Sequence, residues 1–155
     1  MIDPYLVKKI ADITGFRSDI VEQVLNLKSV LRRIYSDPNL ENNYALIGGT
    51  AINFFDPELP RLSVDIDLDY IHTGREEFKD EVIKQHLKIF TKIGESIEME
   101  LFKSKLYPLK LNLIFLFKSN YSPSNEGYIK IDISYITKTP IYPPKRLRIR
   151  MVKNG

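Results

Sequence analysis

The chain has 155 residues, of which 43% are apolar, and this is enough material for one domain with a single hydrophobic core. It contains no cysteine, which excludes disulfides, thiolate metal sites and zinc fingers. No stretch is long and apolar enough to span a bilayer, and no signal peptide opens the chain, so we expect a cytoplasmic protein that makes no membrane contact.

The net charge is only +3, so the overall charge does not indicate a nucleic-acid-binding protein. Its distribution is uneven, because residues 56–81 are rich in aspartate and glutamate whereas residues 138–153 carry only basic charges. We expect a core domain over residues 1–140 and a basic, proline-containing tail over residues 141–155. Such a tail can contact a polyanion or can be a solvated chain end, and both interpretations stay open.

Two helices are expected first. Asp3 followed by Pro4 is typical of a helix start, and Gly15 of a helix end. The predicted apolar stripe between them consists of Tyr5, Leu6, Ile10 and Ile13. Ser18 is expected to cap a second, longer helix that ends at Asp37. Its apolar positions at helical spacing are Ile20, Val21, Val24, Leu27, Leu31 and Ile34. We expect both helices to pack against the core and assign them no chemistry.

The segment 44–71 predicts a strand, a glycine turn, a short helix and a second strand. Residues 44–47 form the first strand, Gly48 and Gly49 the turn, and residues 50–55 the helix. Residues 61–71 then alternate strictly between two faces. One face carries Leu62, Val64, Ile66, Leu68 and Tyr70, and the other carries Ser63, Asp65, Asp67 and Asp69. The apolar face is expected to be buried.

The rest of the chain predicts one helix and three strands. The helix is expected over residues 75–93, with Gly94 as its stop. Strands are expected over residues 97–106, 109–117 and 128–136. In the last of them Ile129, Ile131, Ile133 and Tyr135 alternate with Lys130, Asp132 and Ser134. The histidines, His72 and His86, lie on different elements, and we expect packing roles for them.

Asp65 and Asp67 carry the main chemical prediction. Alternate residues of a strand share a face and lie about 6.5–7 Å apart, so both carboxylates can reach divalent cations. Mg²⁺ is the natural candidate because it prefers hard oxygen ligands and keeps positions open for substrate phosphates. An Asp-x-Asp pair on a half-exposed strand is also common as a simple solvated face. Aspartate is, however, depleted in strands, and such departures from propensity often mark function.

Further residues complete this predicted site. Asp132 places a third carboxylate beside the other two if its strand is their neighbour in the sheet. Gly48 and Gly49 let backbone N–H groups approach phosphate oxygens at a helix start, and the hydroxyl of Thr50 can donate another hydrogen bond. A Gly-Gly pair alone is more often a tight turn. Its combination with Asp-x-Asp on the next strand favours a triphosphate site beside bound metal.

At this point the sequence resembles a known family. Residues 48–53 (GGTAIN) followed by residues 61–68 (RLSVDIDL) are similar to the signature of the AbiEii-type nucleotidyltransferases, toxins of type IV toxin–antitoxin and abortive-infection systems. These belong to the DNA polymerase β-like superfamily. The resemblance, over about residues 1–140, implies an α+β fold with a mixed sheet flanked by helices. It also implies Asp65, Asp67 and Asp132 as metal ligands, and Gly48, Gly49 and Thr50 at the nucleotide phosphates.

The resemblance implies metal-assisted transfer of a nucleoside monophosphate from a nucleoside triphosphate to an RNA such as tRNA, or to a protein. One Mg²⁺ held by all three aspartates would lower the pKa of an acceptor hydroxyl, and a second held by Asp65 and Asp67 would neutralise the triphosphate. Asp132 would be the general base. Arg61 and Ser63 share the acidic face and are candidates for phosphate contacts, although Arg61 is equally suited to pair with a carboxylate of its own strand.

Longer members of the family continue into a helical carboxy-terminal half with further lysine, arginine and aspartate motifs, and residues 141–155 contain no such region. The chain can therefore be a minimal enzyme, a fragment of a longer one, or a degenerate copy. The alternative function is a non-catalytic binding module that acts with a partner chain. The expected partners are a nucleoside triphosphate, an RNA acceptor, and an antitoxin or helical protein.

Overall fold

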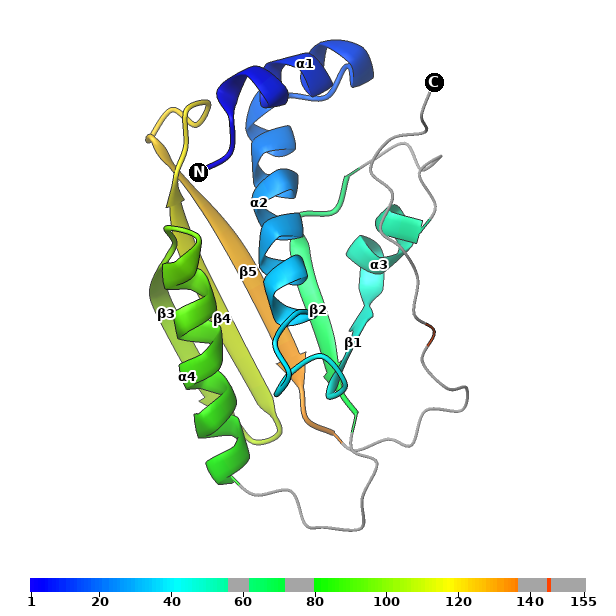
Figure 1. The fold of residues 1–155 in the computed structure, drawn as a ribbon, viewed down its shortest axis with the longest axis vertical. Helices are drawn as coiled ribbons and strands as arrows, with labels where there is room; N and C mark the ends of the chain where they lie inside the picture. Colours follow the sequence, from blue (N-terminus) through cyan, green and yellow to red (C-terminus); the bar gives the residue numbers. More distant parts are fainter. Residues whose placement is uncertain (56–61, 72–79, 137–144, 146–155) are drawn as a thin grey trace.

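The structure is a computed structural model that describes residues 1–55, 62–71, 80–136 and residue 145. Its elements follow in the order α1 (Pro4–Thr14), α2 (Ser18–Ile34), β1 (Tyr44–Ile47), α3 (Gly48–Phe55), β2 (Asp65–Tyr70), α4 (Asp80–Ser96), β3 (Glu100–Tyr107), β4 (Lys110–Lys118) and β5 (Glu126–Ser134). The strands form one five-stranded sheet, and α2 and α4 lie side by side across one of its faces (Figure 1). This arrangement confirms the expected α+β class with a mixed sheet and flanking helices.

The sheet brings together strands that are far apart in the sequence. Its order is β1-β2-β5-β4-β3, with β2 and β5 parallel and every other neighbouring pair antiparallel. The predicted neighbourhood of the two aspartate-bearing strands is therefore confirmed. The parallel pair lies at the centre of the sheet, where a long connection through α4, β3 and β4 returns the chain to β2.

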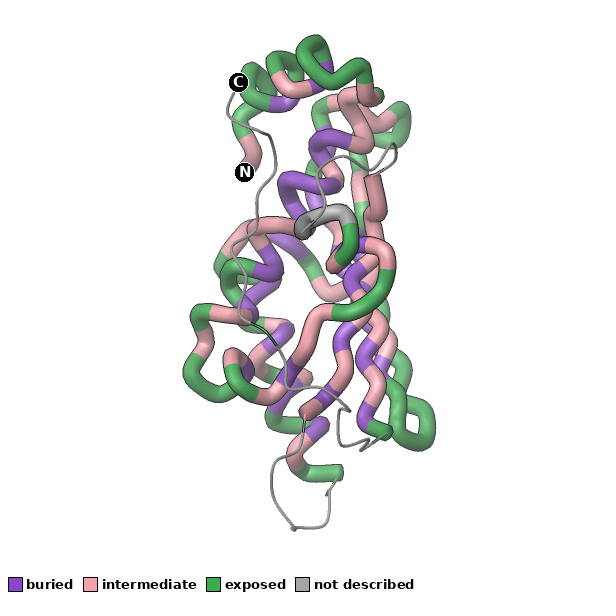
Figure 2. Tube along the Cα trace, turned by 90° about the vertical axis from the view of Figure 1, so that its right-hand side faces the viewer, coloured by how far each residue is buried: buried purple, intermediate pink, exposed green. Residues whose placement is uncertain are grey.

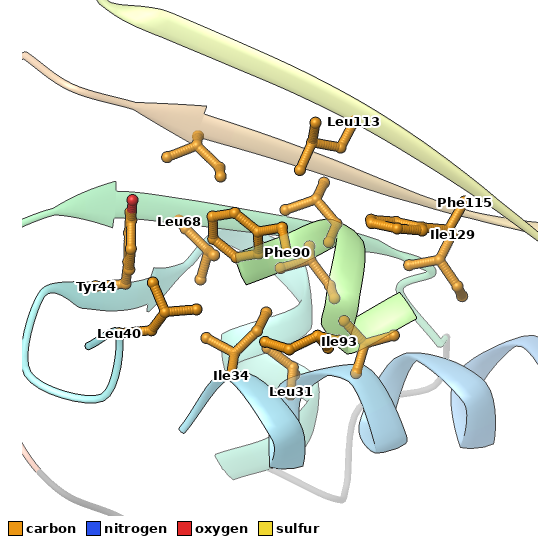
Figure 3. Close-up of a cluster of buried hydrophobic side chains, with 14 of the residues drawn as sticks. Leu31, Ile34, Leu40, Tyr44, Leu68, Phe90, Ile93, Leu113, Phe115 and Ile129 are labelled. Atoms are coloured by element: carbon orange, nitrogen blue, oxygen red, sulfur yellow. The ribbon is translucent and has the colours of Figure 1, made fainter. Parts of the chain in front are cut away.

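The core lies between the helices and one face of the sheet, because each strand alternates between apolar and polar residues. Buried and half-buried residues follow one another along β2, β4 and β5 (Figure 2). Figure 3 shows side chains of α2, α4 and the strands directed toward one another, among them Leu31, Phe90, Leu68 and Phe115. The polar residues are consequently placed on the other face of the sheet.

The first helix has the predicted ends but a different buried face. The Asp3 carboxylate accepts a hydrogen bond from the Tyr5 backbone N–H at 2.9 Å, and Gly15 takes a left-handed conformation. The predicted apolar stripe was wrong at Tyr5, Leu6 and Ile13, which are exposed, whereas Ile10 is half-buried and packs beside the buried Val7 and Ala11. The reason is that α1 packs against α2 and Tyr121 through one narrow i, i+4 stripe, and the Tyr121 hydroxyl donates a hydrogen bond to the Pro4 carbonyl oxygen at 2.7 Å.

The caps of the next elements also differ from expectation. Helix α2 begins at Ser18 rather than being capped by it, and Arg17 takes the cap position without a side-chain hydrogen bond to the helix. Helix α4 continues past Gly94 to Ser96, so Gly94 is not its stop. A Cβ at Gly94 would lie 2.5 Å from the Phe115 ring, which shows that this glycine permits close helix-to-sheet packing.

The predicted strand boundaries agree in their centres and differ at their ends. Strand β2 begins at Asp65, and residues 62–64 before it have no regular structure. Strand β5 begins at Glu126 and ends at Ser134, two residues earlier at each end than predicted. The first residues of the helix expected over 75–93, together with His72, lie outside the described residues.

His86 packs within a buried cluster of aromatic rings. This side chain is 6% exposed, and its Nδ1 atom lies 2.5 Å from the Tyr44 hydroxyl. The same hydroxyl lies 2.9 Å from the hydroxyl of Tyr135. The predicted packing role of His86 is thus confirmed, and burial lowers the pKa of its imidazole.

His86 makes the stability of the fold dependent on pH. The unfolded chain binds the imidazole proton more tightly than the folded one, so the stability from neutral His86 is fully present above about pH 6.5 and is lost as the pH falls. Between about pH 7.5 and 5.5 we expect wild type to lose up to about 1 kcal/mol more stability than His86→Phe, which keeps an apolar ring. Urea unfolding measures both proteins, and parallel pH profiles would contradict this assignment.

Candidate active site

The central strand pair brings the carboxylates together on the face of the sheet that lies away from α2 and α4. In the parallel register of β2 and β5, Asp67 stands directly opposite Asp132, and Asp65 stands opposite Lys130. All four side chains are half-buried. Asp69 lies one pair further along, opposite Ser134. The two predicted motifs therefore meet at a single cross-strand position.

The electrostatics of this position follow from the crowding of negative charge. Partial burial raises the pKa of Asp67, and the charges of Asp132 and Asp65 raise it further, while Lys130 acts in the opposite direction. A carboxylate in such surroundings is stabilised by any additional positive charge. The site is thus suited to bind a cation or to hold a proton.

Two neighbours that the sequence did not single out hold the third carboxylate. The Lys130 ammonium lies 2.9 Å from Oδ2 of Asp132, and the Asn112 amide donates a hydrogen bond to Oδ1. The hydrogen bond with Asp132 raises the pKa of Lys130. Alternation placed Lys130 on the same face as Asp132, but only the register of β4 against β5 shows that Asn112 lies beside it.

A cleft of about 300 Å³ opens at this position. Both Asp67 and Asp132 line it, and so do Asn112, Lys110 and Ser134 from the neighbouring strands and Ile47 from the end of β1. Of the predicted site residues, the cleft lining includes Asp67 and Asp132. The cleft is thus lined by two carboxylates and one lysine.

The glycine turn reaches the carboxylates directly. Gly48 has a φ of 75°, and a Cβ at this position would lie 2.7 Å from Oδ2 of Asp67. Two features therefore favour glycine at position 48, the left-handed backbone conformation and the close approach of the Asp67 side chain. Gly49 lies against Ser63, whose Oγ would be 3.2 Å from an added Cβ. The backbone of this turn thus lies beside the carboxylate pair.

Thr50 connects the turn to β2. Its side chain is 0% exposed, its hydroxyl donates a hydrogen bond to the carbonyl oxygen of Asp65, and it lies 3.0 Å from the Ser63 hydroxyl. These bonds fix the start of α3 against the start of β2, where the first carboxylate stands. The predicted contact of Thr50 with a phosphate stays a prediction, because the hydroxyl is engaged with the protein here.

Removing the Thr50 hydroxyl tests this connection. Thr50→Val keeps the shape of the side chain but leaves the Asp65 carbonyl without its partner, and we expect the free energy of unfolding to fall by about 1–3 kcal/mol. Thr50→Ser keeps the hydroxyl and loses one methyl group, worth about 0.8 kcal/mol. Urea unfolding compares both variants with wild type, and a valine variant as stable as wild type would show that the bond contributes nothing.

The donor set fits a divalent cation by its chemistry. Three carboxylates supply hard oxygen ligands on one face, and burial together with the charges of Asp132 and Asp65 raises the pKa of Asp67. As they stand, the described residues contain no group of three or more histidine or acidic side chains in a metal-binding arrangement. Both oxygens of Asp132 are engaged with Asn112 and Lys130, and each keeps a second lone pair that can bind a metal ion.

Two predicted features fall outside the described residues. Arg61 is one, so its expected phosphate contact is untested. The basic tail is the other, apart from the exposed Lys145.

Comparison with known families decides the identity of this fold. The sequence model described as "Nucleotidyl transferase AbiEii toxin, Type IV TA system" matches residues 29–153, which include all five strands and the glycine turn. The chain belongs to the AbiEii nucleotidyltransferase family. The resemblance of the glycine and Asp-x-Asp motifs to this family is thereby confirmed. A search of curated proteins found no match.

Membership in the AbiEii family makes the chain a nucleotidyltransferase toxin of a type IV toxin–antitoxin system, which implies an antitoxin partner. The match begins within α2 and extends to residue 153, so α1 lies outside it and most of the basic tail lies inside it. None of the helices in the described part of the chain is long and apolar enough to cross a membrane.

Proposed function

We propose that the chain transfers a nucleoside monophosphate from a nucleoside triphosphate to a hydroxyl group of an acceptor, using the Asp65, Asp67 and Asp132 carboxylates. The observation that carries this proposal is the in-register pairing of Asp67 with Asp132 beside the backbone of Gly48. In the reaction a bond forms between the acceptor oxygen and the α-phosphorus. The bond from that phosphorus to the bridging oxygen breaks, and pyrophosphate leaves.

Each side chain has a defined part in this proposal. Asp65, Asp67 and Asp132 hold Mg²⁺, two ions in the full arrangement, which supplies charge neutralisation for the triphosphate and the leaving pyrophosphate. Asp132 accepts the proton of the acceptor hydroxyl as general base. Asn112 holds its Oδ1 in place throughout, and Lys130 holds Oδ2 before substrates bind.

The glycine turn binds the triphosphate in this proposal. The N–H groups of Gly48 and Gly49 lie at the amino end of α3, where unpaired N–H groups favour an anion. A hydrogen bond between the Thr50 and Ser63 hydroxyls holds this turn in place, and Ser63 lies against Gly49. Arg61 is proposed to contact a phosphate oxygen from the segment before β2.

The proposed acceptor is an RNA such as tRNA, with a protein hydroxyl as the other class. Incubation with each of the four nucleoside triphosphates labelled at the α-phosphate, Mg²⁺ and cell extract tests the reaction, with Asp65→Ala as control. Label that is removed by ribonuclease identifies RNA, and label removed by protease identifies protein. We expect transfer with wild type and none with Asp65→Ala.

The same experiment separates the enzyme from a non-catalytic module. An absence of Asp65-dependent transfer with all four nucleotides would contradict the proposed reaction. If nucleotide with Mg²⁺ also failed to raise the melting temperature while a co-expressed helical partner co-purified, the chain would instead be a binding module.

A further inference from the structure

The face of the sheet that carries the aspartates changes sign from one edge to the other. Rows of directly opposed residues cross the strands, and one row runs Asp67, Asp132, Asn112 and Lys105 over β2, β5, β4 and β3. The next row runs Asp65, Lys130, Ile114 and Lys103, and a third runs Asp69, Ser134, Lys110 and Tyr107. In these rows β2 carries only negative charge and the charged residues of β3 and β4 are all lysines, while Glu100 of β3, opposite Leu116, adds one acidic residue to the same face in the row beyond Lys103.

The lysines on β3 and β4 are exposed and lack acidic partners. Lys103, Lys105 and Lys110 are all exposed, and in the described part of the chain none of their ammonium groups lies within 4 Å of a carboxylate. Lys130 differs, because it is paired with Asp132. Unpaired ammonium groups gathered on one surface attract a polyanion.

An aromatic ring completes this surface. Tyr107 is 41% exposed, and the Lys105 ammonium lies 4.6 Å from the centre of its ring. Lys110, directly opposite Tyr107, also lines the cleft that holds Asp67 and Asp132. Neighbouring strands are about 4.8 Å apart, so Lys105 stands about 10 Å from Asp132 along its row. The basic surface is therefore continuous with the proposed active site.

We propose that Lys103, Lys105, Lys110 and Tyr107 form the surface that binds the RNA acceptor, holding its phosphates and one base while its terminal hydroxyl lies at Asp132. This inference rests on the proposed function for the role of that hydroxyl. The sheet order supports separate places for the two substrates. The glycine turn follows β1 on one side of the carboxylates, and the lysines lie on β3 and β4 on the other side.

Binding of RNA without nucleotide or Mg²⁺ tests this surface directly. The probe is a labelled single-stranded RNA of about 12 nucleotides, measured at several salt concentrations. The test variant is Lys103→Gln/Lys105→Gln/Lys110→Gln. The matched control is Lys84→Gln/Lys88→Gln/Lys92→Gln, which removes the same charge from exposed positions of α4 on the helical side of the sheet. Since all six lysines are exposed, both variants are expected to fold.

We expect the test variant to bind RNA about 10- to 100-fold more weakly at about 0.1 M salt, with a salt slope about 2 units smaller, because three phosphate contacts are lost. Tyr107→Leu should weaken binding while leaving the slope unchanged, because stacking releases no counterions. The α4 variant should bind like wild type. Equal losses in both triple variants, or no loss in the test variant, would overturn the proposal.

Kinetics distinguish this proposal from the proposed function. If wild type transfers nucleotide to RNA, the test variant should raise the KM for RNA by a larger factor than the KM for the nucleoside triphosphate. A wild type without transfer activity but with the expected salt slopes would contradict the proposed function and support the binding surface. Transfer to RNA by the test variant with an unchanged KM for RNA would support the proposed function and contradict the binding surface.

Discussion

Asp67→Asn is expected to abolish nucleotidyl transfer and to raise the melting temperature of the metal-free protein. Asparagine keeps the size of the side chain and removes the charge that Asp132 and Asp65 repel. Loss of a metal ligand removes several kcal/mol of transition-state stabilisation, so we expect transfer to fall by at least about 10³-fold. Removal of a charge that is disfavoured by burial and by the neighbouring carboxylates should raise the melting temperature of the metal-free protein.

The gain in stability should depend on pH in a defined direction. Because the folded state raises the pKa of Asp67, the charged carboxylate opposes folding above the pKa range, and a protonated one does not. The difference in melting temperature should therefore be full near neutral pH and should vanish near about pH 2.5, well below the ordinary aspartate pKa of about 3.9, where Asp67 is protonated in both states. Thermal unfolding in a chelator at both pH values measures this.

Asp69→Asn is the matched control, because Asp69 lies on the same face of β2 but opposite Ser134 rather than Asp132. We expect it to keep transfer within about tenfold of wild type, a change of about 1.4 kcal/mol. If Asp67→Asn lost activity no more than Asp69→Asn, the carboxylate pair would not be the reaction centre. A lower melting temperature for Asp67→Asn would contradict the repulsion.

Gly48→Ala is expected to lower nucleotidyl transfer strongly. Its loss of unfolding free energy should be about that of a Gly→Ala substitution at any other left-handed glycine. Its φ of 75° costs an alanine about 1–2 kcal/mol. The added Cβ would lie 2.7 Å from Oδ2 of Asp67, and the free end of that side chain can turn away. Because a shift of about 1 Å in a reacting group can cost about 10²-fold in rate, we expect a loss of transfer of that size.

Gly15→Ala provides the control, since Gly15 has nearly the same φ, 76°, and an added Cβ there meets no atom within 4 Å. Both variants should lose a similar free energy of unfolding, and Gly15→Ala should keep full activity. Urea unfolding and a transfer assay on the two proteins separate backbone strain from the contact with Asp67. Equal activities would show that Gly48 has no part in shaping the site.

The sequence predicted the carboxylates because alternation is a local property. Apolar residues at every second position of β2 and β5 put Asp65, Asp67 and Asp132 on the opposite face, and this needed no knowledge of the fold. The apolar stripe of α1 was wrongly predicted because the buried face of that helix is not a local property. Which face of a short amphipathic helix is buried depends on what it packs against, here α2 and Tyr121, and those contacts are not local.

The partners of Asp132 could not be predicted because they depend on register. Asn112 reaches Asp132 only since β4 pairs with β5 in one specific alignment, and a shift of one residue would place a core leucine there. Gly94 of α4 shows the same limit, because the space that its Cβ would fill is taken by Phe115 of β4. The face on which a side chain lies within one strand could therefore be predicted from the sequence. Contacts between side chains of different elements could not.

The fate of the label from two forms of the same nucleoside triphosphate tests the central claim most directly. The claim predicts that label at the α-phosphate moves to the acceptor and label at the γ-phosphate leaves in pyrophosphate, and that both events disappear in Asp67→Asn. Label moving from the γ-phosphate to the acceptor, or transfer that persists in Asp67→Asn, would contradict nucleotidyl transfer at the Asp67–Asp132 pair.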